Sequence, residues 1–196
     1  HGAAPSASDG FGQLYVEYVG SVLFLNVADI TINARIGESD YSAAASFTTA
    51  GLAAWFDDTD IEATTIGYVN GNGLEPWRYQ HTNFASNKGR VVGIDFEEGL
   101  AVPDVNPPFG SMGEPPASDE DRQGALDPIT VLLNVAMAMN FETEGETCNG
   151  RMPIFDGKSR YDLRFVNVGM DDVRTRAYRG EAIRCQAFVE PISGYD

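Results

Sequence analysis

The chain has 196 residues, of which 43% are hydrophobic, and 13 basic against 29 acidic side chains give a formal net charge of −16. This balance argues against sequence-independent binding to DNA or RNA and against a polybasic membrane patch, because both need clustered cations. No window approaches the roughly 18 apolar residues of a transmembrane helix. The composition predicts a folded, acidic protein with a core of its own.

The N-terminal segment, HGAAPSAS, begins without methionine and is rich in small residues. Such a segment is typical of a mature N-terminus after removal of a signal peptide, although His1-Gly2 also fits a tag remnant. Two cysteines, an even number, fit one disulfide in an oxidising compartment. We therefore expect a periplasmic or cell-surface protein in which residues 1–11 form a flexible leader.

Strand-like patterns dominate the first half of the chain. The segment that starts at Leu14 is rich in Val, Ile, Leu and Tyr, and Gly20-Ser21 offers either a turn or a kink in one long strand. The NGNG stretch at 70–73 predicts a hairpin with a type I′ turn. Successive strands are expected to pair as an antiparallel meander. They are predicted at 14–36, 41–50, 60–69, 74–84 and 89–98.

The strand-like pattern ends before 99–125, where proline, glycine and acidic residues predict a long loop with little regular structure. The stretch LDPITVLLNVAMAMNF then predicts one long hydrophobic helix. Asp127 fits its N-cap, and Pro128 fits its first position, where the missing N–H costs nothing. Strands are predicted again at 151–156, 160–168, 173–179 and 182–190, with turns at Asp156-Gly157, 169–172 and Arg179-Gly180.

This order of elements predicts a mainly β protein. The expected fold is a strongly curved antiparallel sheet, or an open, partial β-barrel, with the hydrophobic helix packed against it. We expect residues 12–196 to form a single barrel-like domain that contains the loop at 99–125.

Catalytic signatures are sparse. His81, the one histidine outside the leader, lies mid-strand without a nucleophile motif, so a half-exposed strand residue is the favoured interpretation. Cys148 and Cys185 lack the spacing of a zinc site. The acidic runs DDTDIE and SDEDR lack the glycine and the spaced acids of a calcium loop. We predict no catalytic residue, no metal site and no cofactor.

The stretch CNGRMPIFDGKSRYDLRF, residues 148–165, gathers polar side chains next to a cysteine. On a strand, Arg160, Asp162 and Arg164 share one face. This polar face is expected either to pair with cross-strand neighbours such as Arg174 or Arg176, or to anchor a ligand at the mouth of a barrel. The other face is expected to carry Tyr161, Leu163 and Phe165.

The two cysteines lie 37 positions apart. A disulfide that closes a loop of this size would contribute roughly 4 kcal/mol in the chain-entropy model. A structural disulfide is the favoured interpretation, and two free buried thiols are the alternative.

The run PIFDGKSRYDLRF, with a cysteine before it and CQAFVEPISGY after it, resembles the signature of the domain-of-unknown-function family 3108. TAGLAAWF, LEPWRYQHTN and LDPITVLLNV resemble further segments of that family, so the similarity extends from about residue 14 to residue 195. The resemblance implies a signal-peptide-bearing periplasmic protein of proteobacteria with a curved, barrel-like β-structure, comparable in kind to lipoprotein carriers and β-spiral envelope proteins. It implies no catalytic residue. It does imply the Cys148–Cys185 disulfide and a signature strand with Asp156, Gly157, Arg160, Tyr161 and Asp162.

The expected function is that of a non-enzymatic envelope protein, which supports envelope integrity by binding a lipid or other apolar ligand, or an envelope protein. The alternatives are an accessory structural subunit of a larger membrane-associated assembly and, third, a hydrolase without a recognisable motif. Members of the family usually continue past SGY, so this chain is either a short member or part of a longer protein. A missing final strand would leave an edge open to a partner. The candidate binding residues are Asp156, Arg160, Tyr161, Asp162 and Arg164.

Overall fold

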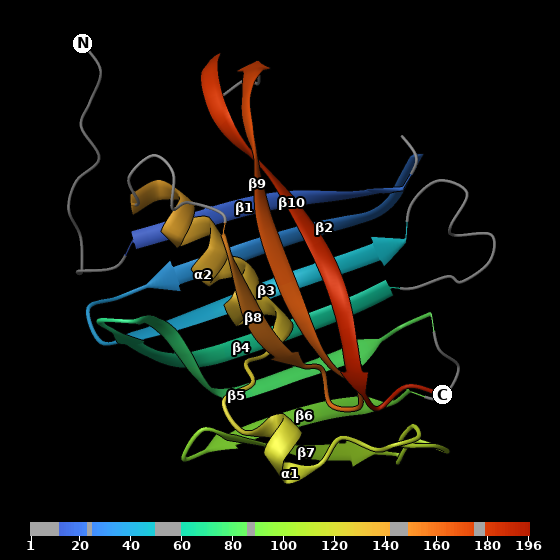
Figure 1. Cartoon of the computed structure of the whole chain (residues 1–196). Coiled ribbons are helices and arrows are strands. Elements are labelled where there is room, and N and C mark those ends of the chain that lie inside the picture. The colour runs from blue at the N-terminus through green and yellow to red at the C-terminus, as the bar shows by residue number, and fades with distance from the viewer. Residues whose placement is uncertain (1–11, 23–24, 50–59, 86–88, 142–148, 175–178) are drawn as a thin grey trace. The chain divides into compact units, whose positions relative to one another are not determined.

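The computed structural model describes residues 12–22, 25–49, 60–85, 89–141, 149–174 and 179–196. The fold is mainly β, as predicted, with 67% of it in strands, and its strands pair antiparallel (Figure 1). The chain divides into two compact units. The first comprises residues 1–95 and 104–108, and the second comprises residues 96–103 and 109–196.

Seven strands form the first sheet as a meander, in which each strand lies beside the next along the chain. Because β1 and β7 are its two edges, the described sheet is open and not closed into a barrel. The end of the β6–β7 hairpin belongs to the second unit. The strands are β1 (Gly12–Val22), β2 (Leu25–Ile36), β3 (Asp40–Thr49), β4 (Asp60–Asn70), β5 (Gly73–Asn83), β6 (Val91–Glu97) and β7 (Leu100–Asn106).

Strand alternation explains which face of the first sheet is buried. In β3 and β4 buried and exposed side chains alternate, because successive side chains of a strand point to opposite faces. Ala43 lies between Ala34 and Thr65 in the register, and all three are buried. We call this the inner face. Its buried residues include Ile32, Ala34, Tyr41, Ala43, Ala63, Thr65, Leu74, Tyr79, Val92 and Ile94.

The segment from Leu14 to Ile36 is a hairpin and not one long strand. β1 and β2 pair antiparallel, and the last pair joins Val22 to Leu25. The register shifts at Gly20/Ser21, so this pair marks a bulge within β1 and not the turn.

The β4–β5 hairpin turns at Asn70–Gly73 as predicted, but not as a type I′ turn. That turn needs positive φ at both central residues, whereas here positive φ falls on Gly73, at 122°. The Asn70 side chain accepts a hydrogen bond from the Asn72 amide at 2.9 Å, which holds the turn instead. Between β6 and β7 both central residues do have positive φ, 50° at Glu98 and 80° at Gly99.

The second unit contains a three-stranded sheet and two short helices. β9 is the central strand, pairing with β10 along its length and with β8 along its first part. Among the described residues no helix is long and apolar enough to cross a membrane. The elements are α1 (Asp119–Arg122), α2 (Pro128–Phe141), β8 (Gly150–Phe155), β9 (Arg160–Arg174) and β10 (Arg179–Ser193).

The turn predicted at 169–172 is wrong, because β9 runs through it. Met170 pairs with Ile183 and Asp172 pairs with Glu181, so the ladder with β10 continues. Gly169, which suggested the turn, has a φ of 110°, and its amide donates to the Asn167 side chain at 2.9 Å. A local distortion inside one strand therefore takes the place of a chain reversal.

Helix α2 begins where the sequence predicts. Asp127 Oδ1 accepts hydrogen bonds from the amides of Ile129 (2.9 Å) and Thr130 (3.0 Å), which is the geometry of an N-cap. Val131 and Val135 belong to the hydrophobic core of the second unit. The helix ends at Phe141, the last residue of the predicted stretch, but with 14 residues it spans only about 21 Å and is a short helix, not the long one expected.

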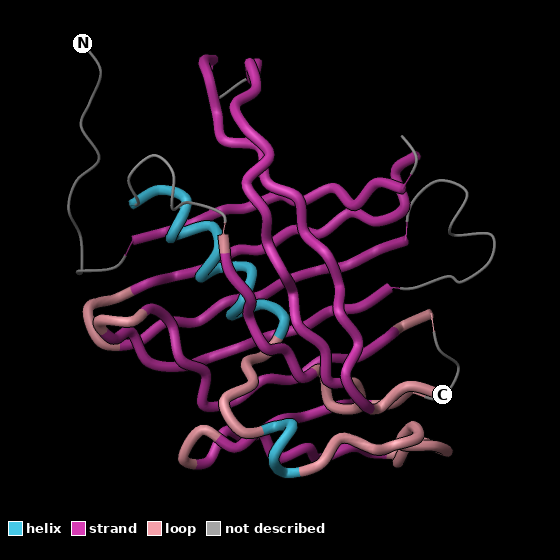
Figure 2. Tube along the Cα trace, in the orientation of Figure 1, coloured by secondary structure: helices cyan, strands magenta, loops and turns pink. Residues whose placement is uncertain are grey.

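Regular structure interrupts the loop predicted at 99–125 (Figure 2). β7 forms although it contains Pro103, which an edge strand tolerates because one of its sides makes no ladder hydrogen bonds. α1 forms because Ser118 and Asp121 make a capping box, in which each side chain binds the other's backbone amide. Between these elements the predicted irregular structure is confirmed for residues 107–117.

Candidate functional site

The predicted two faces of the signature strand β9 are confirmed. Tyr161, Leu163 and Phe165 pack against the hydrophobic core of the second unit, which a period of two places on one face. The side chains on the opposite face form ion pairs instead: Arg160, Asp162 and Arg164.

These ion pairs form a charged ladder across three strands, made of Arg151 on β8, Arg160, Asp162 and Arg164 on β9, and Glu190 on β10. Asp162 Oδ1 lies 2.6 Å from Arg160 Nη1, and its Oδ2 lies 3.6 Å from Arg151 Nη1. Glu190 lies 2.6 Å from Arg151 Nη2 and 2.7 Å from Arg164 Nε. Each carboxylate thus bridges two guanidinium groups, and the charged ladder ties the strands together.

The observed partners of the polar face of β9 differ from those predicted from the sequence, Arg174 and Arg176. Arg174 lies at the far end of β9, opposite Arg179, and is too remote in the register to pair with Arg160. Arg176 lies outside the described residues. The prediction failed because it assumed a turn between 169 and 172, which would have folded these arginines back onto the signature strand.

The end of the charged ladder formed by Arg160 and Asp162 is buried and is hydrogen-bonded to α1. The side chains of Arg160 and Asp162 are 11% and 9% exposed. Arg160 Nε donates to the backbone carbonyl of Asp121 at 2.7 Å, so this guanidinium binds a carboxylate and a helix backbone at once. Because every member of the ladder has an ion-pair partner within it, its chemistry is that of a structural strap.

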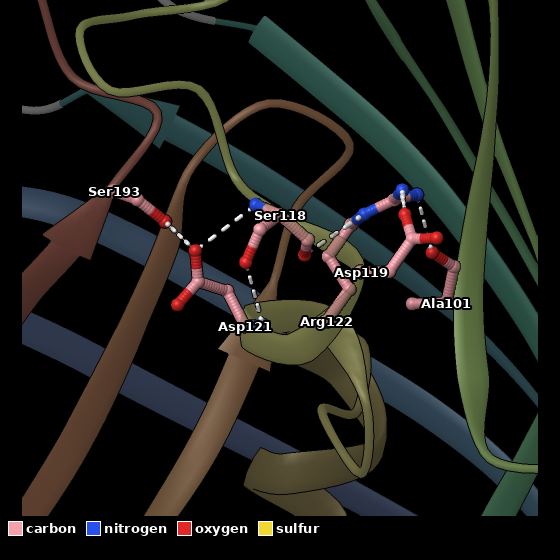
Figure 3. A network of polar contacts seen from close by, with 6 residues as sticks. All are labelled: Ala101, Ser118, Asp119, Asp121, Arg122 and Ser193. Atoms are coloured by element: carbon pink, nitrogen blue, oxygen red, sulfur yellow. Dashed lines mark hydrogen bonds and ion pairs between the residues drawn. The ribbon is translucent and has the colours of Figure 1, made fainter.

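Helix α1 connects the charged ladder to the end of β10. Figure 3 shows its contacts with Ser193 of β10 and Ala101 of β7. Asp121 Oδ2 accepts hydrogen bonds from the Ser118 amide at 2.9 Å and from Ser193 Oγ at 3.0 Å. The bonds from Ser118, with smaller contributions from Ser193 and Arg160, lower the pKa of Asp121. Arg122 Nη1 donates to the Ala101 carbonyl at 2.8 Å. The acidic run SDEDR therefore builds a helix and its cap.

The turn predicted at Asp156-Gly157 is confirmed. Asp156 Oδ1 accepts from the amides of Lys158 (3.0 Å) and Ser159 (2.7 Å), and Gly157 has a φ of 102°. Burial raises the pKa of Asp156, and the two amide hydrogen bonds oppose that shift only in part. The carboxylate therefore serves to shape the turn between β8 and β9.

Two other members of the predicted set contribute to packing. Burial raises the pKa of Tyr161, so its phenol stays neutral at physiological pH. The Arg164 guanidinium lies over the Phe188 ring, 4.5 Å from its centroid, which is a cation–π contact. Tyr161 thus faces the core while Arg164 covers an aromatic ring of β10.

His81 lies on β5 between Ala63 of β4 and Val92 of β6. Its Nδ1 is buried without a hydrogen-bond partner among the described residues, and its ring lies 5.6 Å from that of Tyr79. Burial lowers the pKa of His81 to about 4. The side chain is therefore a neutral imidazole at pH 7, and the residue lies partly exposed on a strand, as the sequence predicted.

The predicted Cys148–Cys185 disulfide stays a prediction, because Cys148 lies outside the described residues. Cys185 lies on β10 opposite Asn167, beside a register shift, and the described residues include no free cysteine. They also contain no group of three or more His, Cys, Asp or Glu side chains that could hold a metal.

The second unit also has a hollow where β10 ends, which we call the terminal hollow. Its volume is about 450 Å³. The backbone closes one side, since the Glu114 amide donates to the Tyr195 carbonyl at 2.8 Å and the Gly194 amide to the Pro115 carbonyl at 2.9 Å. The lining is Glu114, Pro115, Val189, Pro191, Ile192, Ser193 and Tyr195.

Sequence reasoning missed the terminal hollow and three partners of the signature strand: Arg151, Glu190 and Asp121. Strand alternation could have found Glu190, which pairs with Asp162 in the β9–β10 register. The Arg160–Asp121 contact spans 39 positions and depends on how α1 docks, for which the sequence carries no local signal.

Neither a search of curated proteins nor a search of solved structures finds a match to this chain. A family model does match, over residues 14–194, which extends from the third residue of β1 to the end of β10. The chain therefore belongs to the family described as "Protein of unknown function (DUF3108)".

Proposed function

We propose that this protein is a non-enzymatic periplasmic envelope protein that holds an extended segment of another envelope protein along the outer edge of β10. The observation that carries the proposal is the length and exposure of that edge. β10 has 15 residues, and the Val189 side chain is 61% exposed, with Phe188 and Ile192 exposed beside it. Such an edge offers backbone groups to an added strand and apolar side chains to its residues.

The two edges of the three-stranded sheet differ in how they are covered. Beside β8, the Leu126 amide donates to the Pro153 carbonyl and the Phe155 amide donates to the Leu126 carbonyl, both at 3.0 Å. Beside β10, the corresponding backbone hydrogen bonds to other described segments begin at Gly194, after the strand has ended. This difference makes β10 the better edge for strand addition.

The middle of β10 also lacks the usual protection of an edge strand. Soluble proteins guard exposed edges with charges, prolines or short strands. Residues 186–189 are four consecutive exposed and uncharged residues, Gln, Ala, Phe and Val. On β10 itself the nearest cation, Arg184, forms an ion pair with Asp171 of the neighbouring strand at 3.2 Å, while Arg164 of β9 lies over the Phe188 ring. An edge so unguarded favours a partner that covers it.

The proposed periplasmic location rests on the sequence, through an even cysteine count that fits one disulfide in an oxidising compartment. A partner that stays bound would make the protein an accessory subunit of a larger membrane-associated assembly, and a partner that exchanges would make it a carrier. In both cases the same edge does the binding.

Site-specific photo-crosslinking in the source cells tests this proposal. A photoreactive residue at Val189 should give one defined crosslinked envelope protein, and the same residue at Phe84 should not. Phe84 is a matched control because it is 60% exposed and lies in the first unit. A synthetic peptide of the crosslinked segment should then protect the amides of 180–190 from hydrogen exchange. Equal crosslinking from both positions, or a peptide that protects other amides, would contradict the proposal.

The terminal hollow favours a second candidate, an apolar ligand such as a lipid acyl chain. Val189, Ile192 and Tyr195 give its lining an apolar character. Native mass spectrometry of gently purified protein, followed by lipid extraction, should then show a bound lipid that Ile192→Asp removes. Lipid-free spectra together with a positive crosslink at Val189 would leave the protein partner as the function.

A further inference from the structure

A groove of about 720 Å³ crosses β1 to β4 in the first unit, independently of the β10 edge. Each strand contributes three consecutive residues to its lining. The central ones, Leu14, Ala34, Ala43 and Thr65, form one continuous cross-strand row. The side chains of Ala34, Ala43 and Thr65 are buried on the inner face, so this row contributes its backbone as the floor. The space therefore lies on the opposite, outer face, and we call it the outer groove.

The walls of the outer groove are the two flanking rows of outward side chains, and they combine polar groups with apolar surface. One wall presents Gln13, Arg35, Ser42 and the apolar Ile66, which are paired in the register. The other wall presents Tyr15, Asn33 and Thr64, with Ala44 between the last two. Two amides, a guanidinium and two aliphatic hydroxyls thus line a space in which Ser42 and Ala44 leave room for a ligand.

The charge of the outer groove differs from that of the whole chain. Its twelve lining residues include one cation, Arg35, and no carboxylate. The whole chain has a net charge of −16. The absence of carboxylates from this lining argues against a cationic ligand. A long acyl chain would leave the amides and hydroxyls of the walls without partners.

Tyr15 is the aromatic residue of the outer groove and is held in place by its own strand. Its hydroxyl donates to Glu17 Oε1 at 2.7 Å, while 57% of the residue remains exposed. An exposed ring that is fixed at its polar end presents an apolar surface at little cost in conformational entropy.

We propose that the outer groove binds an oligosaccharide chain. A sugar ring has an apolar C–H face that packs on an aromatic ring, and equatorial hydroxyls that need planar donors and acceptors. Tyr15 supplies the ring surface, Gln13 and Asn33 supply amides, and Arg35 supplies donors for ring oxygens or a sugar carboxylate. A peptide fits less well, because the backbone of the floor is already paired within the sheet and cannot accept a further strand.

Isothermal titration of the full chain with three hexasaccharides tests this proposal: chitohexaose, cellohexaose and a galacturonic acid hexamer. At least one should bind, and Tyr15→Ala should weaken its binding about tenfold or more, which corresponds to the loss of one good contact. Ala44→Leu, which narrows the groove from an exposed position, should also weaken it. A preference for the acidic hexamer would assign Arg35 to the sugar carboxylate, and a preference for a neutral one would assign it to hydroxyls.

Tyr68→Ala is the matched control, because Tyr68 is 52% exposed on β4 and lies outside the groove lining. It should change the affinity less than twofold, and circular dichroism should show all three variants folded. The proposal is overturned if none of the three sugars binds at millimolar concentration, or if Tyr68→Ala weakens binding as much as Tyr15→Ala does. Binding of peptides from a tryptic digest that Ala44→Leu abolishes and sugars do not displace would also overturn it.

Discussion

The first unit joins its strands through a regular register, whereas the second unit joins its strands and helices through polar side chains. In the first sheet, neighbours along the chain pair residue by residue, and the ion pair that links two of its strands, Arg78–Asp95, is half exposed. In the second unit the charged ladder crosses three strands and reaches α1. A meander can rely on backbone pairing, but a small sheet that receives loops from distant parts of the chain needs specific side-chain ties.

The second unit also has places where backbone segments that are distant in the sequence approach one another closely. A Cβ built on Gly194 would lie 2.1 Å from the Lys158 carbonyl oxygen, and one built on Gly113 would lie 2.2 Å from the Gly194 carbonyl carbon. Three segments of the second unit therefore meet at glycines. Lys158 Nζ adds an ion pair of 2.6 Å with Asp196 at the same place.

The largest predicted effect comes from Gly194→Ala. The new methyl group would overlap the Lys158 carbonyl oxygen, and the φ of 82° is strained for any residue with a Cβ. Together the two should lower the free energy of unfolding by about 3 kcal/mol or more. Urea denaturation followed by circular dichroism measures this change. Hydrogen exchange should show the loss first in peptides that cover 156–159 and 190–196.

Gly110→Ala provides the control within the same unit. A Cβ at Gly110 has open space around it and no positive φ to strain it, so the change should stay within about 0.5 kcal/mol. Equal effects of the two substitutions would mean that the glycine contacts do not hold the second unit together.

The next largest predicted effect is a difference in stability. Breaking the charged ladder should cost more than breaking the exposed Arg78–Asp95 ion pair of the first sheet. Asp162→Ala leaves the buried Arg160 guanidinium without its carboxylate and should cost about 3 kcal/mol, because an unpaired buried charge is unfavourable. Asp95→Ala breaks the exposed Arg78–Asp95 pair and should cost less than about 1 kcal/mol. Thermal and urea unfolding of both variants measure the contrast.

A double variant distinguishes loss of the pair from loss of packing. Arg160→Leu combined with Asp162→Leu removes both charges, so it should be more stable than Asp162→Ala alone. The interpretation of the charged ladder as a structural strap fails if the double variant is the less stable one.

The sequence predicted the first sheet better than the second unit, for a physical reason. Alternation and turn residues act locally, so the strands from Asp40 to Glu97 and the turn at Asn70–Gly73 could be located in advance. The faces of β9 followed from the same alternation.

The predictions that failed concern features that depend on contacts between residues far apart in the sequence. Gly169 resembled a turn residue, yet pairing with β10 carried β9 through it. Pro103 argued for a loop, yet an edge position allowed β7 to form. The shared polar face of Arg160, Asp162 and Arg164 followed from alternation. Their partners Arg151, Glu190 and Asp121 come from elements that local patterns do not place.

An acid-sensitive group is predicted in the first unit. Burial lowers the pKa of His81 from 6.5 to about 4, so the unfolded chain binds a proton that the folded chain excludes between these two values. This contribution to stability is complete above pH 6.5 and is lost as the pH falls toward 4. Between pH 7.5 and pH 5 the loss should be about 2 kcal/mol. Urea unfolding measures it through tryptophan fluorescence, because both tryptophans lie within residues 1–95.

His81→Gln isolates this contribution from that of the carboxylates. The variant should lose about 2 kcal/mol less than the wild type over the same pH interval, since glutamine does not titrate. Parallel stability curves for the two proteins would contradict a buried, neutral His81.

The smallest predicted effect concerns Asp156. Burial raises the pKa of its carboxyl group, whereas the hydrogen bonds of the turn lower it. Burial raises its pKa, so the folded state holds the proton more tightly than the unfolded state and ionisation destabilises the fold as the pH rises. The substitution Asp156→Asn would keep an oxygen acceptor for the Lys158 and Ser159 amides without a charge at this position. The variant should therefore be at least as stable as the wild type at pH 7.

Asp156→Ala removes the acceptor and should cost about 1–2 kcal/mol, because two amides of the turn lose their partner. Any advantage of Asp156→Asn at pH 7 should shrink as the pH falls and the wild-type carboxyl becomes protonated. Stability curves of the three proteins between pH 4 and pH 8 test both statements. If Asp156→Asn is as unstable as Asp156→Ala at every pH, then the negative charge itself holds the turn, and the turn that leads into the signature strand depends on charge as the charged ladder does.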